Sequence, residues 1–224
     1  MTNLLQYIEW MWDVRAEGAL TADRGRAHRL LLVPALFDEA NKLRRFSVEV
    51  MRHLDSKGID SLLPDLPGCN ESMAALASQS SSAWRAAMTA VAAQWGATHM
   101  LAIRGGALVA PALPGWALAP VKGASVLRQM LRARVLAARE AGRDESSEAL
   151  LAAGMTAGLE LAGYTLSSTF IKEFHNLEVE ISSAITIIEQ STLGGPGLWL
   201  RAEPGEDPAQ TAALASRICE GLAA

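Results

Sequence analysis

The residues whose types and spacing could do chemistry gather at Ala102-Ile103-Arg104-Gly105-Gly106, where a predicted strand ends. Small residues two before and two after a central position permit the sharp strand-to-helix turn of the G-x-S-x-G motif, whose serine attacks an acyl carbon. Here the small residues are present, but the central residue is Arg104. A guanidinium stays protonated at any useful pH, so Arg104 cannot act as an acyl-accepting nucleophile. The sequence therefore predicts an intact turn without its usual chemistry.

A serine-type triad also needs a histidine base, and in proteins with this motif the histidine follows the last strand. No histidine follows residue 175; the four are His28, His53, His99 and His175. The loop expected after the last strand carries Glu-Pro-Gly-Glu-Asp at residues 203–207 instead. Two of the three members of a triad are therefore missing.

Two interpretations of Arg104 remain open. In the first, Arg104 anchors a carboxylate or phosphate, helped by the positive end of a helix that begins just after it. In the second, Arg104 forms an internal salt bridge to Asp38, Glu39 or Asp65. The residues that we expect to bind a ligand are Arg104, Gly105, Gly106, Asn41 and Lys42.

Four other residues are weaker candidates for catalysis. One of the carboxylates Asp38, Glu39 and Asp65 could activate a water molecule, although capping and solvated ion pairs of the following helix also account for the charges near Asn41. Cys69 could be a substitute nucleophile, but it lies in a Pro-Gly-Cys-Asn turn with no histidine obviously placed to activate it. The only other cysteine, Cys219, is distant and there is no CxxC pair, so we expect reduced thiols, no metal and no cofactor.

A basic stripe is predicted on the helix that follows Lys122. At the α-helical turn angle, four arginines share one face if the helix continues far enough. This face is either solvated or a docking surface for an acidic partner, an anionic saccharide or a lipid intermediate. The four are Arg128, Arg132, Arg139 and Arg143.

The elements that must position these residues alternate between buried apolar runs and amphipathic helices. Strands are expected at 30–33, 59–63, 98–103, 116–119, 184–188 and 197–200. Helices are expected at 42–56, 83–95 and 207–222, with a small-residue helix opening at Gly105. This alternation predicts a mostly parallel sheet between two helical layers, a three-layer α/β sandwich.

One segment breaks the alternation. Residues 123–176 indicate two or three helices, interrupted near 142–144 and 163–165, and we interpret them as a helical cap inserted into a single domain spanning 1–224.

Composition agrees with one cytoplasmic globular domain. Half of the 224 residues are apolar, which suffices for a core, and the net charge of -4 gives no general case for nucleic acid as a partner. The amino-terminal segment mixes acidic with apolar residues, unlike a signal peptide, and prolines interrupt the longest uncharged stretch, 105–121, so no transmembrane segment is expected. The sequence leaves open whether the chain forms a homodimer.

Over most of its length the sequence resembles the exosortase A system-associated hydrolases, most closely the second of their two types. The matching segments are 31–34, 39–45, 64–72, 104–108, 120–123, 127–129 and 162–167. The resemblance implies an α/β-hydrolase fold, an arginine that often replaces the elbow serine, and a link to exopolysaccharide production or export. One departure is Pro34-Ala35, where the family usually has a histidine and a glycine in a region that forms the oxyanion hole of active relatives.

The function that these observations favour is binding without serine-hydrolase activity, with a small anionic ligand or an exopolysaccharide-system protein as the partner. The alternative is an active hydrolase or acyltransferase that acts on an ester or thioester by a non-triad mechanism. A purely structural role in a complex predicts an apolar surface patch and no well-formed pocket.

Overall fold

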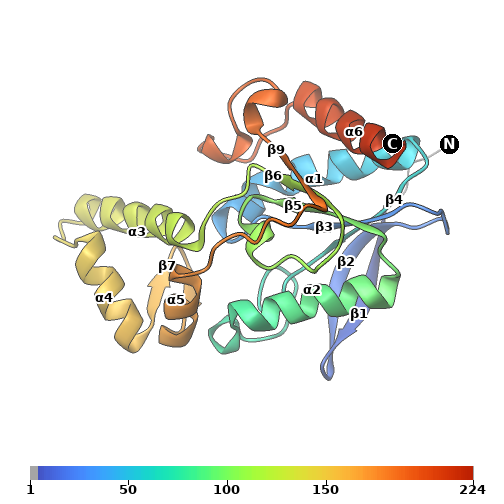
Figure 1. Cartoon of the computed structure of the whole chain (residues 1–224). Coiled ribbons are helices and arrows are strands. Elements are labelled where there is room, and N and C mark those ends of the chain that lie inside the picture. Colours follow the sequence, from blue (N-terminus) through green and yellow to red (C-terminus); the bar gives the residue numbers. More distant parts are fainter. Residues whose placement is uncertain (1–4, 224) are drawn as a thin grey trace.

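The computed structural model describes residues 5–223. Its centre is a seven-stranded sheet with the order β1-β2-β4-β3-β5-β6-β9, in which the strands from β4 to β9 are parallel (Figure 1). The strands are β1 Gln6–Trp12, β2 Arg15–Ala22, β3 Arg29–Val33, β4 Asp60–Pro64, β5 His99–Ile103, β6 Gly115–Leu118 and β9 Ile185–Ile188. The predicted α/β class with a mostly parallel sheet is confirmed.

The antiparallel hairpin β1–β2 precedes the first strand that the sequence predicted. It pairs Trp12 with Arg15 across a turn in which Asp13 has a φ of 53°, and β2 then pairs antiparallel with β4. Within β1 only Trp10 is fully buried. The apolar residues of β1 therefore do not alternate strictly with polar ones, which is why the pattern indicated no strand here.

The helices cover both faces of the sheet. Helices α1 (Asp38–Ser56) and α6 (Pro208–Ala223) lie together on one face, and α2 (Ser81–Trp95) lies on the other (Figure 1). Leu30 and Leu32 belong to the core on the α1 side, whereas Leu31 and Val33 belong to the core on the α2 side. A strand whose successive side chains enter two different cores must be apolar throughout, as the run in β3 is.

The inserted segment 123–176 stands at one side of the sheet (Figure 1). It contains α3 (Gly123–Glu140), α4 (Ser147–Ala157), α5 (Ser168–His175) and the small hairpin of β7 (Leu159–Leu161) and β8 (Tyr164–Leu166). The predicted helices are present, and the interruption expected near 163–165 is this hairpin. Within residues 5–223, no helix has the length and apolar character needed to cross a membrane.

Two predicted elements are wrong and are short 3-10 helices instead. Residues 197–200 do not form a last strand: Leu198–Leu200 is a 3-10 helix with Leu198 and Trp199 buried, and the Trp199 ring packs on Arg104. The helix expected from Gly105 extends only over five residues, since the connection to β6 contains Pro111 and Pro114. The four 3-10 helices of the described residues are η1 Leu76–Ser78, η2 Arg104–Leu108, η3 Gln190–Thr192 and η4 Leu198–Leu200.

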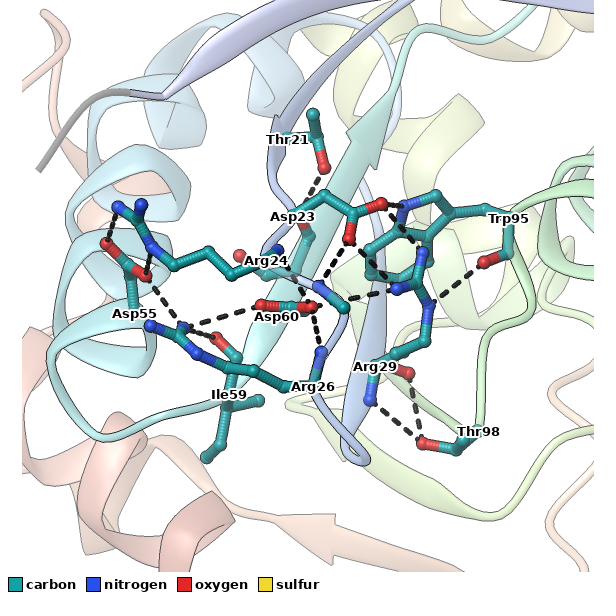
Figure 2. Close-up of polar contacts among 12 residues, drawn as sticks. Thr21, Asp23, Arg24, Arg26, Arg29, Asp55, Ile59, Asp60, Trp95 and Thr98 are labelled. Atoms are coloured by element: carbon teal, nitrogen blue, oxygen red, sulfur yellow. Dashed lines mark hydrogen bonds and ion pairs between the residues drawn. The ribbon is translucent and has the colours of Figure 1, made fainter.

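A polar network ties together the amino-terminal ends of the parallel strands (Figure 2). Asp60, at the start of β4, is fully buried and accepts hydrogen bonds from the backbone N–H groups of Arg24 and Arg26 at 3.0 and 2.8 Å. The side chains of Arg26 and Arg29 approach the same carboxylate to 3.4 and 3.6 Å.

Two further carboxylates complete this network. Asp55 accepts bonds from Arg24 and Arg26, and Asp23 accepts two from Arg29 and one from the indole of Trp95 (Figure 2). The arginine side chains are the largest cause that lowers the pKa of both Asp23 and Asp55 to about 2. We call this set the amino-end network: Asp23, Asp55, Asp60, Arg24, Arg26 and Arg29.

Candidate functional site

The turn after β5 has the strained geometry that the sequence predicts. Arg104 has a φ of 54°, in the left-handed region that non-glycine residues rarely adopt. A Cβ atom on Gly106 would lie 2.4 Å from the carbonyl oxygen of Pro34, so only glycine fits there. The loops after β3 and β5 are therefore in close backbone contact, as a tight nucleophile elbow requires.

The side chain of Arg104 is held by internal partners. Its Nε and Nη2 donate to the two carboxylate oxygens of Glu39, each at 3.1 Å, and Nη1 donates to the carbonyl oxygen of Ala119 at 2.8 Å. Its guanidinium carbon also lies 4.0 Å from the centroid of the Trp199 ring. Of the two interpretations of Arg104, the structure contains the salt bridge, and its partner is Glu39.

The ion pair between Arg104 and Glu39 is largely buried and has little contact with solvent. The side chains of Arg104 and Glu39 are 13% and 6% exposed. A bidentate arginine–carboxylate pair is both stronger and more directional than a single ionic contact. An anion that approached Arg104 would therefore have to compete with a carboxylate already in the optimal position.

Each partner of Arg104 comes from a different part of the chain. Glu39 lies in the first turn of α1, the Ala119 carbonyl directly follows β6, and Trp199 lies in η4. Carboxyl ends of parallel strands meet at one edge of a sheet, which brings these loops together. The elbow position and the loops that surround it are thus filled by an internal cluster of Arg104, Glu39 and Trp199, which we call the elbow cluster.

Two small hollows flank the start of α1. One, of about 260 Å³, is lined by Asn41, Cys69 and Tyr164 among others. The other, of about 250 Å³, is lined by Lys42 and Glu39 of α1 and by Gln129 and Met130 of α3. Arg104, Gly105 and Gly106 are not among the residues that line either hollow. The expected binding residues are thereby divided: Asn41 lines one hollow and Lys42 the other, and the elbow residues line neither.

Phe37 connects the two hollows with the inserted segment. It precedes α1 with a φ of 56° and is 3% exposed. Its ring centroid lies 5.2 Å from that of Tyr164 and 5.7 Å from that of Phe174. This aromatic packing fixes the inserted segment against the start of α1.

Asp38 and Lys42 form an ion pair of 2.8 Å along the helix, and the Asp38 side chain is half exposed. This is the solvated pairing that the sequence offered as one reason for the charges near Asn41. An exposed pair at this spacing contributes about 0.3–0.5 kcal/mol at most. The Asp38 carboxylate is therefore open to solvent, whereas the Lys42 side chain is only 17% exposed.

Asp65 and Cys69 lie in the loop after β4. One oxygen of Asp65 accepts bonds from Arg44 and Asn70, at 3.0 and 2.7 Å, while the other is buried without a hydrogen-bond partner among the described residues. Burial, together with the nearby charges of Asp65 and Glu17, raises the pKa of the Cys69 thiol to about 12. Cys69 is consequently a protonated thiol at neutral pH and a poor nucleophile.

The histidines lie away from the elbow cluster. His28 and His99 pack edge to face at the amino ends of β3 and β5, with ring centroids 6.1 Å apart. Burial, and secondly the neighbouring His28, lowers the pKa of His99. His53 is in the last turn of α1 and His175 ends α5. Throughout residues 5–223, no group of three His, Cys, Asp or Glu side chains is arranged to hold a metal ion.

The predicted basic stripe is present on α3, with one correction. Arg128, Arg132 and Arg139 are exposed on this helix, but Arg143 lies beyond its end at Glu140 and approaches Glu145 instead. The glycine at 142, with a φ of 71°, turns the chain away before the stripe can continue. In the described part of the chain, none of the three helical arginines has an ion-pair partner.

Sequence reasoning missed Trp199, the Ala119 carbonyl, Phe37 and Tyr164. Trp199 lay inside a run that was expected to be a strand, and a backbone carbonyl leaves no signal in the sequence. The only signal for Phe37 was a large apolar residue between the end of β3 and the acidic start of α1; its ring contacts, with Trp84, Tyr164 and Phe174 among others, come from distant parts of the chain.

Comparisons with known proteins were made at the levels of sequence and fold. No protein-family model matches the chain, and no curated protein matches it. Among solved structures, alpha/beta hydrolase domain-containing protein 10 from mouse is similar over 98% of this chain and 98% of that chain, with 12% identity and a TM-score of 0.60. Est1E from Butyrivibrio proteoclasticus with bound ferulic acid covers 77% of this chain and 72% of that chain, with 15% identity and a TM-score of 0.55.

An epoxide hydrolase from Vigna radiata overlaps only in part. The similarity covers 53% of this chain and 40% of that chain, with 16% identity and a TM-score of 0.42. The chain therefore spans less than half of that enzyme. The likeness to the first two proteins extends over most of the chain and shows an α/β-hydrolase fold.

Proposed function

We propose that this chain is a non-hydrolytic protein of the α/β-hydrolase fold that binds an anionic saccharide during exopolysaccharide production or export. The observation that carries the non-hydrolytic part is the elbow cluster, in which the nucleophile position holds a guanidinium bonded to Glu39. The link to exopolysaccharide rests on the sequence resemblance to the exosortase A system-associated hydrolases.

The other candidate nucleophile does not weaken this proposal. A thiol with a pKa of about 12, as at Cys69, is almost entirely protonated at neutral pH. The nucleophile position therefore holds no hydroxyl, and the thiol of the neighbouring loop is not activated.

Arginine side chains on α3 that have no ion-pair partner among the described residues support an anionic ligand. A hollow of about 280 Å³ is lined by Arg128 and Arg132 of α3, Ser147 and Glu148 of α4, and His175 of α5, among others. The Nδ1 atom of His175 is buried and has no partner in the described structure. Among the described residues these two guanidinium groups have no ion-pair partner, and with the Ser147 hydroxyl they suit a carboxylate or phosphate on a sugar; Glu148 is the one carboxylate in the lining.

We further propose that segment 123–176 acts as a cap over the elbow region. Tyr164 closes one of the two small hollows, and Gln129 and Met130 close the other. Each hollow is smaller than a typical small-molecule site of about 300–1,000 Å³.

A second candidate function is hydrolysis by a water molecule that Asp65 activates. The specific observation in its favour is the fully buried second carboxylate oxygen of Asp65, which has no partner among the described residues. Replacement of Asp65 by Asn keeps the shape and removes the base, so it separates this mechanism from background turnover.

The test begins with the purified protein, a fluorophosphonate probe and a panel of short and long acyl esters. We expect neither labelling nor turnover. Turnover that Arg104→Ala abolishes would overturn the non-hydrolytic proposal, and turnover that only Asp65→Asn abolishes would establish the second candidate.

Binding is tested separately with a short uronate oligosaccharide and a neutral glucose oligosaccharide of equal length. The expected result is binding of the uronate alone, weakened about thirtyfold or more in Arg128→Gln/Arg132→Gln, because each of the two lost charged contacts costs about 1 kcal/mol or more. Arg139→Gln is the matched control, since Arg139 lies on the same helix but does not line the hollow. Equal binding of the two oligosaccharides would contradict an anionic specificity.

A further inference from the structure

One face of the sheet lacks the helix that a parallel connection normally supplies. Neighbouring parallel strands need a long crossover, which is usually an α-helix. Between β5 and β6, residues 104–114 form only the 3-10 helix η2 and an irregular loop. Between α5 and β9, residues 176–184 contain no helix or strand. In Figure 1, these green and orange connections pass beside α2 on this side of the sheet.

The incomplete cover leaves a large apolar hollow beside the sheet. Its volume is about 670 Å³, and Met100, Ala102 and Ala117 contribute to it from β5 and β6. Most of the remaining wall is apolar and comes from residues 107–114 and 179–185. Small side chains on the strands and the absence of a packed helix among the described residues together explain why this space is open.

A single cation lies where this hollow meets a second one along α2. Arg85 lines both the first hollow and the adjoining one of about 690 Å³, and among the described residues it is the only lysine or arginine lining either. Its Nη2 donates to the carbonyl oxygen of Leu108 at 3.0 Å, which fixes the guanidinium. Its Nη1 contacts Glu180 at 2.9 Å.

Glu180 is a weak partner that a ligand can replace. Its side chain is 78% exposed and belongs to the irregular segment 176–184. An ion pair this exposed contributes about 1 kcal/mol or less. A ligand carboxylate that also buries an apolar chain gains free energy that Glu180 cannot supply.

We propose that this groove binds an aliphatic carboxylate, with its alkyl chain along Met100, Ala102 and Ala117 and its carboxylate on Arg85 in place of Glu180. Within the described chain, no aromatic side chain lines the first hollow, so it has nothing on which to stack a sugar or an aromatic ring. Its hydroxyl groups are those of Thr89 and Ser182. The site differs from the α3 surface in chemistry and residues, so this inference stands whether or not the saccharide proposal holds.

Affinity measurements with dodecanoate and dodecanol test this proposal on the full chain, below the concentrations at which either aggregates. We expect dodecanoate to bind about tenfold more tightly than dodecanol, because a charge-assisted hydrogen-bond pair favours the acid even after Glu180 is displaced. Arg85→Gln should remove this preference. Glu180→Gln should tighten dodecanoate binding about threefold and leave dodecanol binding unchanged, because only the competing charge is lost.

A third variant tests the place of the alkyl chain. Ala110→Trp puts a large ring into the first hollow and should weaken both ligands at least tenfold. Ala153→Trp, at an exposed position of α4, and Arg139→Gln are the matched controls. Circular dichroism on each variant checks that the fold is kept.

Equal affinity of the native chain for the acid and the alcohol, or binding of neither, would overturn the proposal. So would dodecanoate binding that Glu180→Gln does not tighten or that Ala110→Trp leaves unchanged. Because Glu180 is exposed, its variant remains informative even if Arg85→Gln fails to fold.

Discussion

Two clusters of arginines and carboxylates stand at opposite ends of the same parallel strands. The amino-end network joins three arginines to three aspartates and also takes up backbone N–H groups (Figure 2). The elbow cluster joins one arginine to one glutamate and one tryptophan, on a backbone with positive φ. Arginine–carboxylate pairs thus connect backbone segments at one end of the strands and fill the turn after β5 at the other.

The difference shows that the groups around an arginine–carboxylate pair decide whether the pair also holds the backbone or joins side chains only. Asp60 accepts hydrogen bonds from two backbone N–H groups, so the network replaces main-chain hydrogen bonds at the start of the sheet. Among the described side chains, Arg104 is the only one that donates hydrogen bonds to the Glu39 carboxylate. Removal of the first should therefore disturb the fold more than removal of the second.

The largest expected effect is that of Asp60→Ala. Asp60 is fully buried, and its loss leaves two backbone donors and part of two guanidinium groups without an acceptor. We expect the free energy of unfolding to fall by about 3–5 kcal/mol. Denaturant unfolding measures it, with Asp144→Ala at an exposed site as the control. A loss below that of Arg104→Ala would reverse the comparison.

The next effect is that of Arg104→Ala, which leaves Glu39 buried without its partner. We expect a loss of about 3 kcal/mol. Arg104→Gly should lose about 1 kcal/mol less, because glycine adopts the φ of 54° without strain. The two variants are compared by thermal and denaturant unfolding; equal losses would show that the elbow carries no backbone strain.

The third effect is a dependence of stability on pH that comes from the amino-end network. The pKa of Asp23 and of Asp55 is about 2 in the folded chain, below the ordinary value of 3.8. Carboxyl groups with a depressed folded pKa contribute stability that is fully present above about pH 4, and this contribution is lost as the pH falls from about 4 to about 2.

For the two groups together, after discounting for solvent screening, this contribution is about 2 kcal/mol. Unfolding measured from pH 6 to pH 2 checks it. In Asp23→Asn/Asp55→Asn the slope in this range should become shallower; an unchanged slope would assign it to other carboxyl groups.

The smallest effect concerns reactivity and leaves the fold unchanged. With a pKa of about 12, Cys69 should react with iodoacetamide at pH 8 far more slowly than Cys219, whose thiol is less buried. Mass spectrometry of the alkylated peptides measures the ratio of rates. Faster labelling of Cys69 would show an activated thiol beside the elbow region.

The sheet was predictable from the sequence wherever a strand is buried on both faces. Continuous apolar runs such as Leu30–Val33, ended here by a proline, are typical of such strands and are too short for an ordinary helix. The run Leu198–Leu200 looked similar, yet it is a 3-10 helix because Trp199 packs on Arg104. A tertiary contact, invisible in the local pattern, decided its structure.

The backbone turn around Arg104 was predictable from the sequence, but the carboxylate that pairs with Arg104 was not. Small residues around Arg104 constrain the backbone locally, so the motif survives in the sequence. The choice of Glu39 over Asp38 or Asp65 depends on which carboxylate faces β5 across 65 residues of chain. The amino-end network depends on such distant pairings throughout, and no local pattern of residues indicated it.

The elbow cluster also restricts how this chain could change over evolutionary time. A serine at position 104 would inherit a backbone already shaped for a nucleophile, but it would leave Glu39 unpaired in a buried site and Trp199 without its cation. A histidine would still be needed nearby. A single substitution toward serine at this position would therefore give a less stable chain, so the three residues together oppose the introduction of a nucleophile one residue at a time.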